Sequence, residues 1–295
     1  MGTFRGDCFD KKPWHNAPVV DLLCGGGGLR ETARKLHMAR TALQLKARKL
    51  SLNCHWLHRN QLARAELVGD FMLDEAIVFE EDRRLRPLSL AVLIEKPSWL
   101  IIDAFASTKP PHGSRSKATQ ERIDRMVARE GERRDRHTTG IAKVLRTLVW
   151  CGLPTEAPRL TLISDKEPTY RDVLMRVSRA LPCAKVTHVT FKSDEYKRGL
   201  EHPLFEVDHT FALMRDRVGR FRRMSWLHSK MRKWLNRMVA LYICFRNYVR
   251  PSVNRGAYTP GQLAGIPTGR LSLHQLVRWR QDWGPERSVL PTARV

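Results

Sequence analysis

The alternation of apolar and polar residues changes character along the chain. Residues 17–50 repeat apolar side chains at helical spacing, interrupted by the glycine run 25–28. Residues 66–105 instead contain three runs rich in Val, Ile, Leu and Phe, separated by turn residues, which is typical of strands. The second gap is short enough for a hairpin. We therefore predict a small helical unit followed by three antiparallel strands.

The later pattern predicts a mixed α/β domain. Residues 107–140 are polar and highly charged, which indicates an inserted loop with one solvated helix. A helix, a buried strand that ends at Asp165, an amphipathic helix and another strand follow. From about residue 204 the pattern is mostly helical up to Tyr248. This order of elements is compatible with a ribonuclease H-like sheet with flanking helices.

The first 60 residues match the pattern of a helix-turn-helix DNA-binding region. Two helices are joined by a tight turn, and the second would enter the major groove of DNA. The side chains that it would offer to DNA are Arg40, Gln44, Lys46 and Lys49. The turn contains His37, where small residues are usual. A plain helical hairpin with basic surface residues is the alternative.

Charge is distributed unevenly along the chain. The formal net charge is +23. Residues 211–295 carry 17 basic and 3 acidic side chains, whereas residues 61–110 are net negative, with 6 basic and 9 acidic side chains. Basic regions on both sides of an acidic middle favour a nucleic acid partner. A basic protein that binds any polyanion is the alternative.

Other compositional signals narrow the class of protein. The six cysteines are scattered without a C-x-x-C pair, so neither a zinc ribbon nor a disulfide framework is indicated. No apolar run is long enough for a membrane span. The first residues lack the apolar core of a secretory signal, so we expect a cytoplasmic protein.

Two isolated aspartates point to metal chemistry on a phosphodiester. Asp74 lies inside an apolar strand, where a charge is costly unless it is paired or metal-bound. Asp165 ends a buried strand, a common position for site residues. Two-metal cleavage needs such carboxylates to converge in space. For Asp165, capping of the following helix is an alternative role.

The start of the last long helical stretch supplies candidates for a third carboxylate. Asp208 is the first choice, with Glu206 and Glu201 as alternatives. Asp208, Arg215 and Arg222 are spaced by seven and would share one helical face. That face would carry a metal ligand followed by two phosphate-binding guanidinium groups. Alternatively, these acids only complement the helix dipole.

Several segments in order resemble bacterial insertion-sequence transposases of the DDE type that have a helix-turn-helix before the catalytic domain. The resemblance spans roughly residues 14–247. It rests on LDEAIVFEEDRRLRPLSLAV, LISDKEPTY, HPLFEVDHTFALMRDRVGRFRRMSWLHSK and ALYICFRNY. Typical members carry Glu as the third acid, and Asp208 departs from this pattern.

The resemblance implies a ribonuclease H-like catalytic domain over residues 66–250 and a basic tail over 251–295. It implies cleavage and transfer of DNA strands with Mg²⁺ or Mn²⁺ held by Asp74, Asp165 and Asp208. The residues expected to hold phosphates are Arg215, Arg222, Arg223 and Lys230. A homo-oligomer on the DNA of the element ends and target is also implied. The alternative function is a DNA-binding regulator whose transposase-derived domain is inactive.

Overall fold

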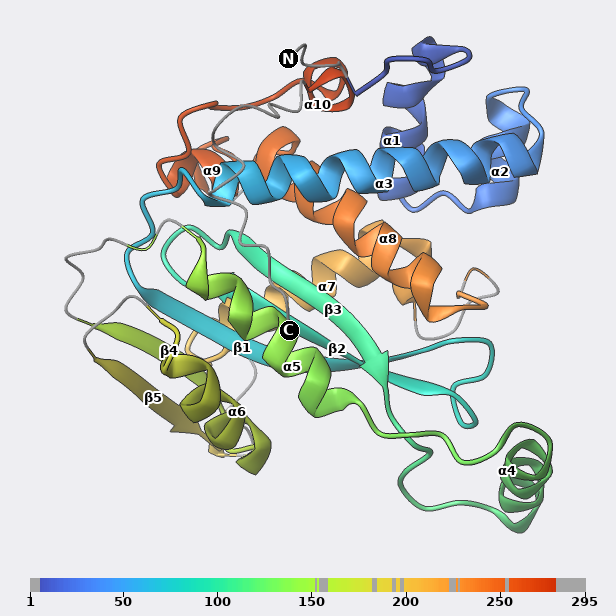
Figure 1. The fold of residues 1–295 in the computed structure, drawn as a ribbon, viewed down its shortest axis with the longest axis vertical. Helices are drawn as coiled ribbons and strands as arrows, with labels where there is room; N and C mark the ends of the chain where they lie inside the picture. The colour runs from blue at the N-terminus through green and yellow to red at the C-terminus, as the bar shows by residue number, and fades with distance from the viewer. Residues whose placement is uncertain are drawn as a thin grey trace.

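A computed structural model gives the fold of the chain (Figure 1). It describes residues 6–151, 153, 159–181, 185–192, 195–196, 199–222, 227, 229–252 and 255–279. Within these ranges, no helix is long and apolar enough to cross a membrane.

The centre of the molecule is a mixed five-stranded sheet. Its strands are β1 (Asp70–Phe79), β2 (Pro87–Glu95), β3 (Ile101–Thr108), β4 (Leu160–Asp165) and β5 (Val186–Phe191). Their spatial order is β3-β2-β1-β4-β5. Strand β2 pairs antiparallel with β1 and β3, whereas β1, β4 and β5 are parallel. This topology confirms the predicted α/β, ribonuclease H-like fold class and both predicted antiparallel pairings.

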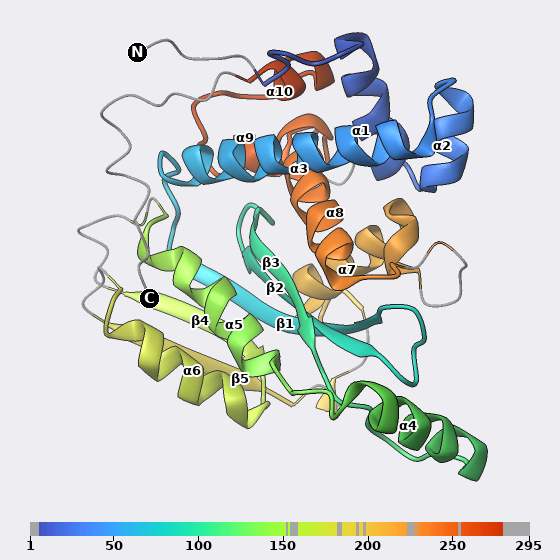
Figure 2. The same cartoon turned by 45° about the vertical axis from the view of Figure 1, so that its right-hand side comes forward.

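Helices cover both faces of the sheet. Helices α5 (His137–Arg146) and α6 (Pro168–Ser178) lie on one face, and α7 (Phe205–Arg217) lies on the other (Figures 1 and 2). Strand β2 is buried along its whole length, as expected for a strand with both faces covered. The predicted amphipathic helix at α6 is confirmed, because its apolar side chains Tyr170, Val173 and Leu174 are buried.

The N-terminal helices are part of the same core as the sheet. They are α1 (Asn16–Cys24), α2 (Leu29–Lys35) and α3 (Arg40–Leu62). The predicted end of the first helix at the glycine run is confirmed, and α3 runs twelve residues past Leu50. It packs along α8 (Arg232–Cys244), and its Leu43, Leu50 and Leu57 belong to one hydrophobic cluster with the strands.

Side chains from the C-terminal part of the chain bind the open edge of β3. The Asn236 side chain bonds the backbone N–H and C=O of Ala106, at 2.8 and 3.1 Å. The Asn247 side chain does the same at Ile101, at 3.1 and 2.8 Å. Each side-chain amide thus replaces two of the backbone hydrogen bonds that a sixth strand would make with β3.

A buried histidine links α3 to the same edge. His58 Nε2 lies 2.9 Å from the Ile102 carbonyl oxygen, and its Nδ1 lies 2.6 Å from the Tyr248 hydroxyl. Burial lowers the pKa of His58 to about 4, so the ring is neutral near pH 7. The helical unit is therefore attached to the sheet by polar contacts as well as by apolar packing.

The charged insertion is shorter than the predicted 107–140. Its helix α4 (Lys117–Glu130) projects from the body of the molecule, as Figure 2 shows, and confirms the single predicted helix. Helix α5 begins at His137, inside the expected insertion, because Ile141, Val144 and Leu145 bury one of its faces. The apolar period of α5 therefore starts earlier than the charge pattern indicated.

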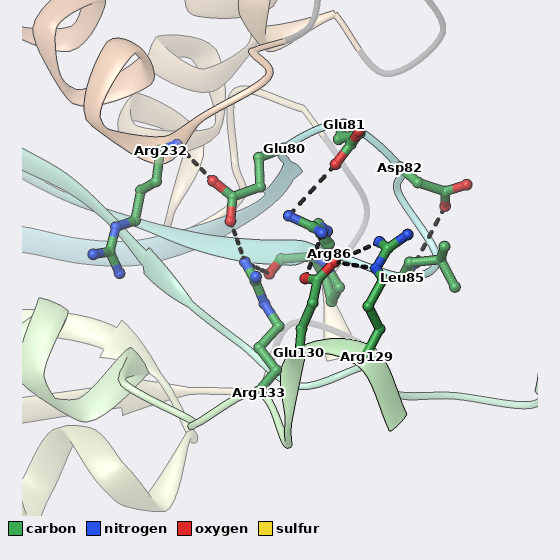
Figure 3. Close-up of polar contacts among 10 residues, drawn as sticks. Glu80, Glu81, Asp82, Leu85, Arg86, Arg129, Glu130, Arg133 and Arg232 are labelled. Atoms are coloured by element: carbon green, nitrogen blue, oxygen red, sulfur yellow. Dashed lines mark hydrogen bonds and ion pairs between the residues drawn. The ribbon is translucent and has the colours of Figure 1, made fainter. Parts of the chain in front are cut away.

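Ion pairs attach the insertion to the turn between β1 and β2 (Figure 3). Glu80 accepts from Arg133 Nη2 at 2.8 Å and from the backbone N–H of Arg232 at 2.5 Å. Arg86 lies 2.5 Å from Glu130 and 3.4 Å from Glu81. The Glu80 and Arg133 side chains are 12% and 14% exposed, so this pair is the one shielded from water.

Part of the predicted basic tail is folded onto the N-terminal helices. It contains α9 (Pro260–Leu263) and α10 (Leu273–Arg278), and α10 packs on α1. Ile266, Leu271 and Leu276 are buried. Residues 280–295 lie outside the described part. Short 3-10 turns lie at Pro13–His15, Thr147–Val149 and Gly219–Phe221, and a π-helical turn at Phe245–Val249.

We predict that Glu80→Gln lowers the free energy of unfolding by about 1–3 kcal/mol, because a shielded, charge-assisted pair with Arg133 is lost. Glu81→Gln is the matched control and should change stability little, since the Glu81 side chain is 54% exposed. Urea denaturation of both variants measures the difference. Equal effects of the two substitutions would contradict this role for Glu80.

Candidate active site

The pairing of β1 with β4 places the two predicted aspartates, Asp74 and Asp165, side by side in the sheet. The parallel register joins Asp70 with Thr161 and Met72 with Ile163. Continued by two residues, the same register puts Asp74 beside Asp165 at the carboxyl end of β4. The two aspartates are 91 positions apart in sequence and lie on adjacent strands of the sheet.

The surroundings of Asp74 disfavour its charge. Burial is the largest cause, and with the nearby charges of Asp165 and Asp208 it raises the pKa of Asp74 to about 8. The backbone N–H of Glu75 donates to Asp74 Oδ1 at 2.7 Å and partly opposes this. Burial and the charge of Glu167 also raise the pKa of Asp165. A nearby cation would relieve this repulsion.

Asp208 is the third acid whose charge acts on Asp74. It lies in the first turn of α7, on the sheet face opposite α5 and α6, and its side chain is 54% exposed. Its Oδ2 lies 3.7 Å from Nδ1 of the buried His202. That nitrogen also accepts the backbone N–H of Leu204, at 3.2 Å.

Glu206 and Glu201, the two alternatives for the third acid, differ in how far they are buried. Glu206 also lies in the first turn of α7 and is half-buried. Glu201 is exposed in the turn that precedes the helix. The electrostatic effect on Asp74 favours Asp208 over both.

Sequence reasoning missed the role of the residue next to Asp74. Glu75 points to the opposite face, as the strand period requires, and accepts from the Ser89 hydroxyl and from the Tyr170 hydroxyl at 3.3 Å. Tyr170 belongs to α6, so Glu75 ties that helix to β1. A second acid beside the first within an apolar strand was the available signal. Nothing in the sequence around His202 indicated that it contacts Asp208.

The expected phosphate-binding face does not form as predicted, because helix α7 ends before Arg222. Helix α7 stops at Arg217, and Val218 has an extended backbone with φ −116°. The seven-residue spacing therefore does not place Arg222 on the face of Asp208 and Arg215. Arg222 instead donates to the carbonyl oxygen of Asp216 at 3.1 Å and is exposed.

The other basic residues of this segment are distributed differently. Arg215 is half-buried, and its guanidinium carbon lies 5.8 Å from the Phe211 ring centre. Lys230 is exposed, and Arg223 lies outside the described residues. Phe211 and Met214 of α7, with Val218 and Phe221 after it, are buried in the core.

Only part of the predicted DNA-reading face of α3 points outward. Arg40 is exposed at the start of the helix, whereas Gln44 is half-buried beside α8. Lys46 is buried, and its ammonium group bonds Asn16 Oδ1 at 2.7 Å and lies 3.5 Å from Asp10. The prediction that Lys46 faces DNA is therefore wrong for the folded chain, because the segment before α1 covers it.

The donor chemistry of the three aspartates fits a hard divalent cation, since Mg²⁺ and Mn²⁺ prefer carboxylate oxygens. In the described part of the chain, however, no three acidic, histidine or cysteine side chains are arranged so that they could hold a metal ion as they stand. Asp74 Oδ1 is turned to the N–H of Glu75. Metal binding would require the carboxylates to reorient.

Comparisons with known proteins give weak structural likenesses. No family model and no curated protein matches the chain. The catalytic domain of Mos1 mariner transposase is similar over 68% of this chain and 85% of that one, with 15% identity and a TM-score of 0.26. Two structures of that domain with raltegravir, one with Mg and one with Mn, cover 68% of this chain and 86% of theirs. They are 14% and 15% identical, with TM-scores of 0.25 and 0.24.

We predict a pH dependence of stability that arises from Asp74. Its folded-state pKa of about 8 lies above the ordinary value of 3.8, so between these values the folded chain holds a proton that the unfolded chain releases. Stability should therefore fall as the pH rises through this window, with a slope approaching about 1.4 kcal/mol per pH unit. Urea denaturation in chelator should show a smaller fall for Asp74→Asn.

Asp172→Asn on the exposed side of α6 serves as the control and should follow the wild-type protein. Parallel pH profiles for the wild type and Asp74→Asn would show that Asp74 titrates at its ordinary value.

Proposed function

We propose that the chain is a DNA transposase that cleaves and transfers the strands of an insertion element at Asp74, Asp165 and Asp208. The observation that carries the proposal is that Asp165 of β4 and Asp208 of α7 lie near enough to the buried Asp74 of β1 for their charges to raise its pKa. Their position in a ribonuclease H-like sheet supports it further.

The three carboxylates would hold Mg²⁺ or Mn²⁺, which when bound activates the attacking oxygen and stabilises the leaving oxygen. Asp74 and Asp165 would supply two ligands from adjacent strands, and a rigid sheet limits their relative movement. Asp208 approaches from α7 and is the most exposed of the three. It would therefore close the ligand set from the side on which DNA enters.

Basic side chains near the acids would hold the DNA backbone. Arg215 follows Asp208 by two helical turns, and Arg222 and Lys230 are exposed in the segment after α7. Arg223 belongs to the same proposed set. Arg40 would contact DNA from the start of α3. We further propose that protomers assemble on the two element ends.

A second candidate function is a DNA-binding regulator with an inactive catalytic domain. The observation that favours it is that, in the described residues, the acids are not arranged as a metal site. The two functions differ in one measurable property, since only the transposase requires a divalent cation for strand cleavage.

The test uses the full chain and a supercoiled plasmid that carries the DNA segments flanking the coding sequence. We expect Mg²⁺ or Mn²⁺ to support nicking and joining. Asp165→Asn should lower the rate by about a hundredfold or more, because metal ions contribute several kcal/mol to such reactions. Sequence-specific binding of the plasmid ends without cleavage in either metal would favour the regulator.

The third acid is tested separately with isosteric variants. Asp208→Asn should lose activity like Asp165→Asn, whereas Glu206→Gln and Glu201→Gln should keep it. Far-UV circular dichroism controls for folding. Full activity of Asp208→Asn together with a loss in Glu206→Gln would move the third ligand to Glu206.

A further inference from the structure

A cavity of about 240 Å³ lies beside α7, apart from the three aspartates. Its walls come from the β2–β3 turn, from one stripe of α7, and from the end of α8 with the residues that follow it. The α7 stripe contains His209, Leu213 and Arg217, spaced by four. Asp208 precedes this stripe by one residue and so points to a neighbouring face of the helix.

Three guanidinium groups line this cavity, those of Arg217, Arg246 and Arg250. A fourth, that of Arg255, lies next to it over the Trp99 ring, 4.5 Å from the ring centre. Like charges this close repel one another. The site is therefore positive, with Arg246 and Arg250 as the charges that no carboxylate partner offsets within the described residues.

The positive charge of Arg246, at the centre of this cavity, has no carboxylate partner in the described part of the chain. Arg246 is only 3% exposed, and its Nη1 donates to the Ser252 hydroxyl at 2.9 Å. Arg217 Nε lies 3.0 Å from Asp216 Oδ2, whereas no ion pair within the described residues joins a carboxylate to Arg246 or Arg250. Burial and the charges of Arg250 and Arg255 lower the pKa of Arg246. A buried charge without a counter-ion is costly, so an anion here would stabilise the fold.

Two polar nitrogens of the lining residues have no partner within the described part of the chain. Trp99 Nε1 and His209 Nδ1 are both buried and make no hydrogen bond. The ring centres lie 5.1 Å apart, and the backbone N–H of Trp99 donates to the Glu95 carbonyl oxygen at 2.9 Å, which holds Trp99 in the β2–β3 turn. Buried polar groups usually have partners; Trp99 Nε1 is a donor, and His209 Nδ1 is a donor in one tautomer of the ring. Beside the guanidinium groups of Arg246 and Arg250 they fit a ligand with several acceptor oxygens.

We propose that this cavity binds a phosphate group, through Arg246 and Arg250 with Arg217, Trp99 and His209 around it. Phosphate matches the site because it offers several acceptor oxygens and a charge near −2, and because guanidinium groups bind it with paired hydrogen bonds. The phosphate is free or is carried by a nucleic acid strand, and these two sources share the same chemistry at the cavity.

The site is independent of the metal chemistry. Its side chains carry no carboxylate and its occupant needs no divalent cation. Phosphate binding and strand cleavage can therefore succeed or fail separately, although the cavity and Asp208 share α7. The inference goes beyond the proposed function and does not require it.

The test measures inorganic phosphate binding to the full chain by calorimetry, in chelator and at constant ionic strength. Arg250→Gln should weaken binding about tenfold or more, because a charged hydrogen-bond donor is lost. Arg176→Gln, on the exposed side of α6, is the matched control and should bind like the wild type. Asp74→Asn should also bind phosphate normally.

A second readout does not depend on substituting an arginine. Phosphate should change the tryptophan fluorescence of the wild type, and Trp99→Phe should lose most of this change. Failure of the wild type to bind phosphate, or equal affinities of Arg250→Gln and Arg176→Gln, would overturn the proposal.

Short oligonucleotides with and without a 5′-phosphate identify the source. Tighter binding of the phosphorylated strand, abolished by inorganic phosphate and by Arg250→Gln, supports the cavity as a site for a strand end. Phosphate binding with no effect of the 5′-phosphate supports it as a site for a free phosphate.

Discussion

The register between β1 and β4 is the constraint on which the candidate site depends. It places Asp74 beside Asp165 although the two are far apart in sequence. The antiparallel pairing of β1 with β2 fixes the other side of Asp74, opposite Val92. A shift of one residue would turn Asp74 to the face of α6 and bring Glu75 to the face of α7. The hydrophobic pattern of the strands therefore determines which carboxylate faces the third acid.

Local sequence signals predicted the sheet and two of its aspartates because those signals are short-range. Apolar runs give strands, and Asp74 stands out within one of them. The inward position of Lys46 was not predictable, because it depends on Asp10, in a segment with no regular pattern, and on Asn16 at the start of α1. The displacement of Arg222 was also missed, since nothing in the heptad spacing signals the extended backbone at Val218.

Helix α7 combines two opposite electrostatic environments on neighbouring faces. Asp208 lies on the face directed to the other aspartates, whereas His209 and Arg217 line the cavity that also contains Arg246 and Arg250. A helix exposes different side chains every 100°, so one element can favour a cation on one side and an anion on the next. The amphipathic core stripe of Phe211 and Met214 holds both faces in place. Movements of α7 would therefore affect both sites.

The asparagine contacts at β3 have a consequence for how copies of this chain can assemble. An exposed edge strand is a template on which another chain adds a strand of its own. Asn236 and Asn247 occupy that template at two points, and α8 lies over it. Continuation of the sheet from one protomer into another is therefore blocked on this side. Contacts between copies of the chain on this side must instead use helical or loop surfaces.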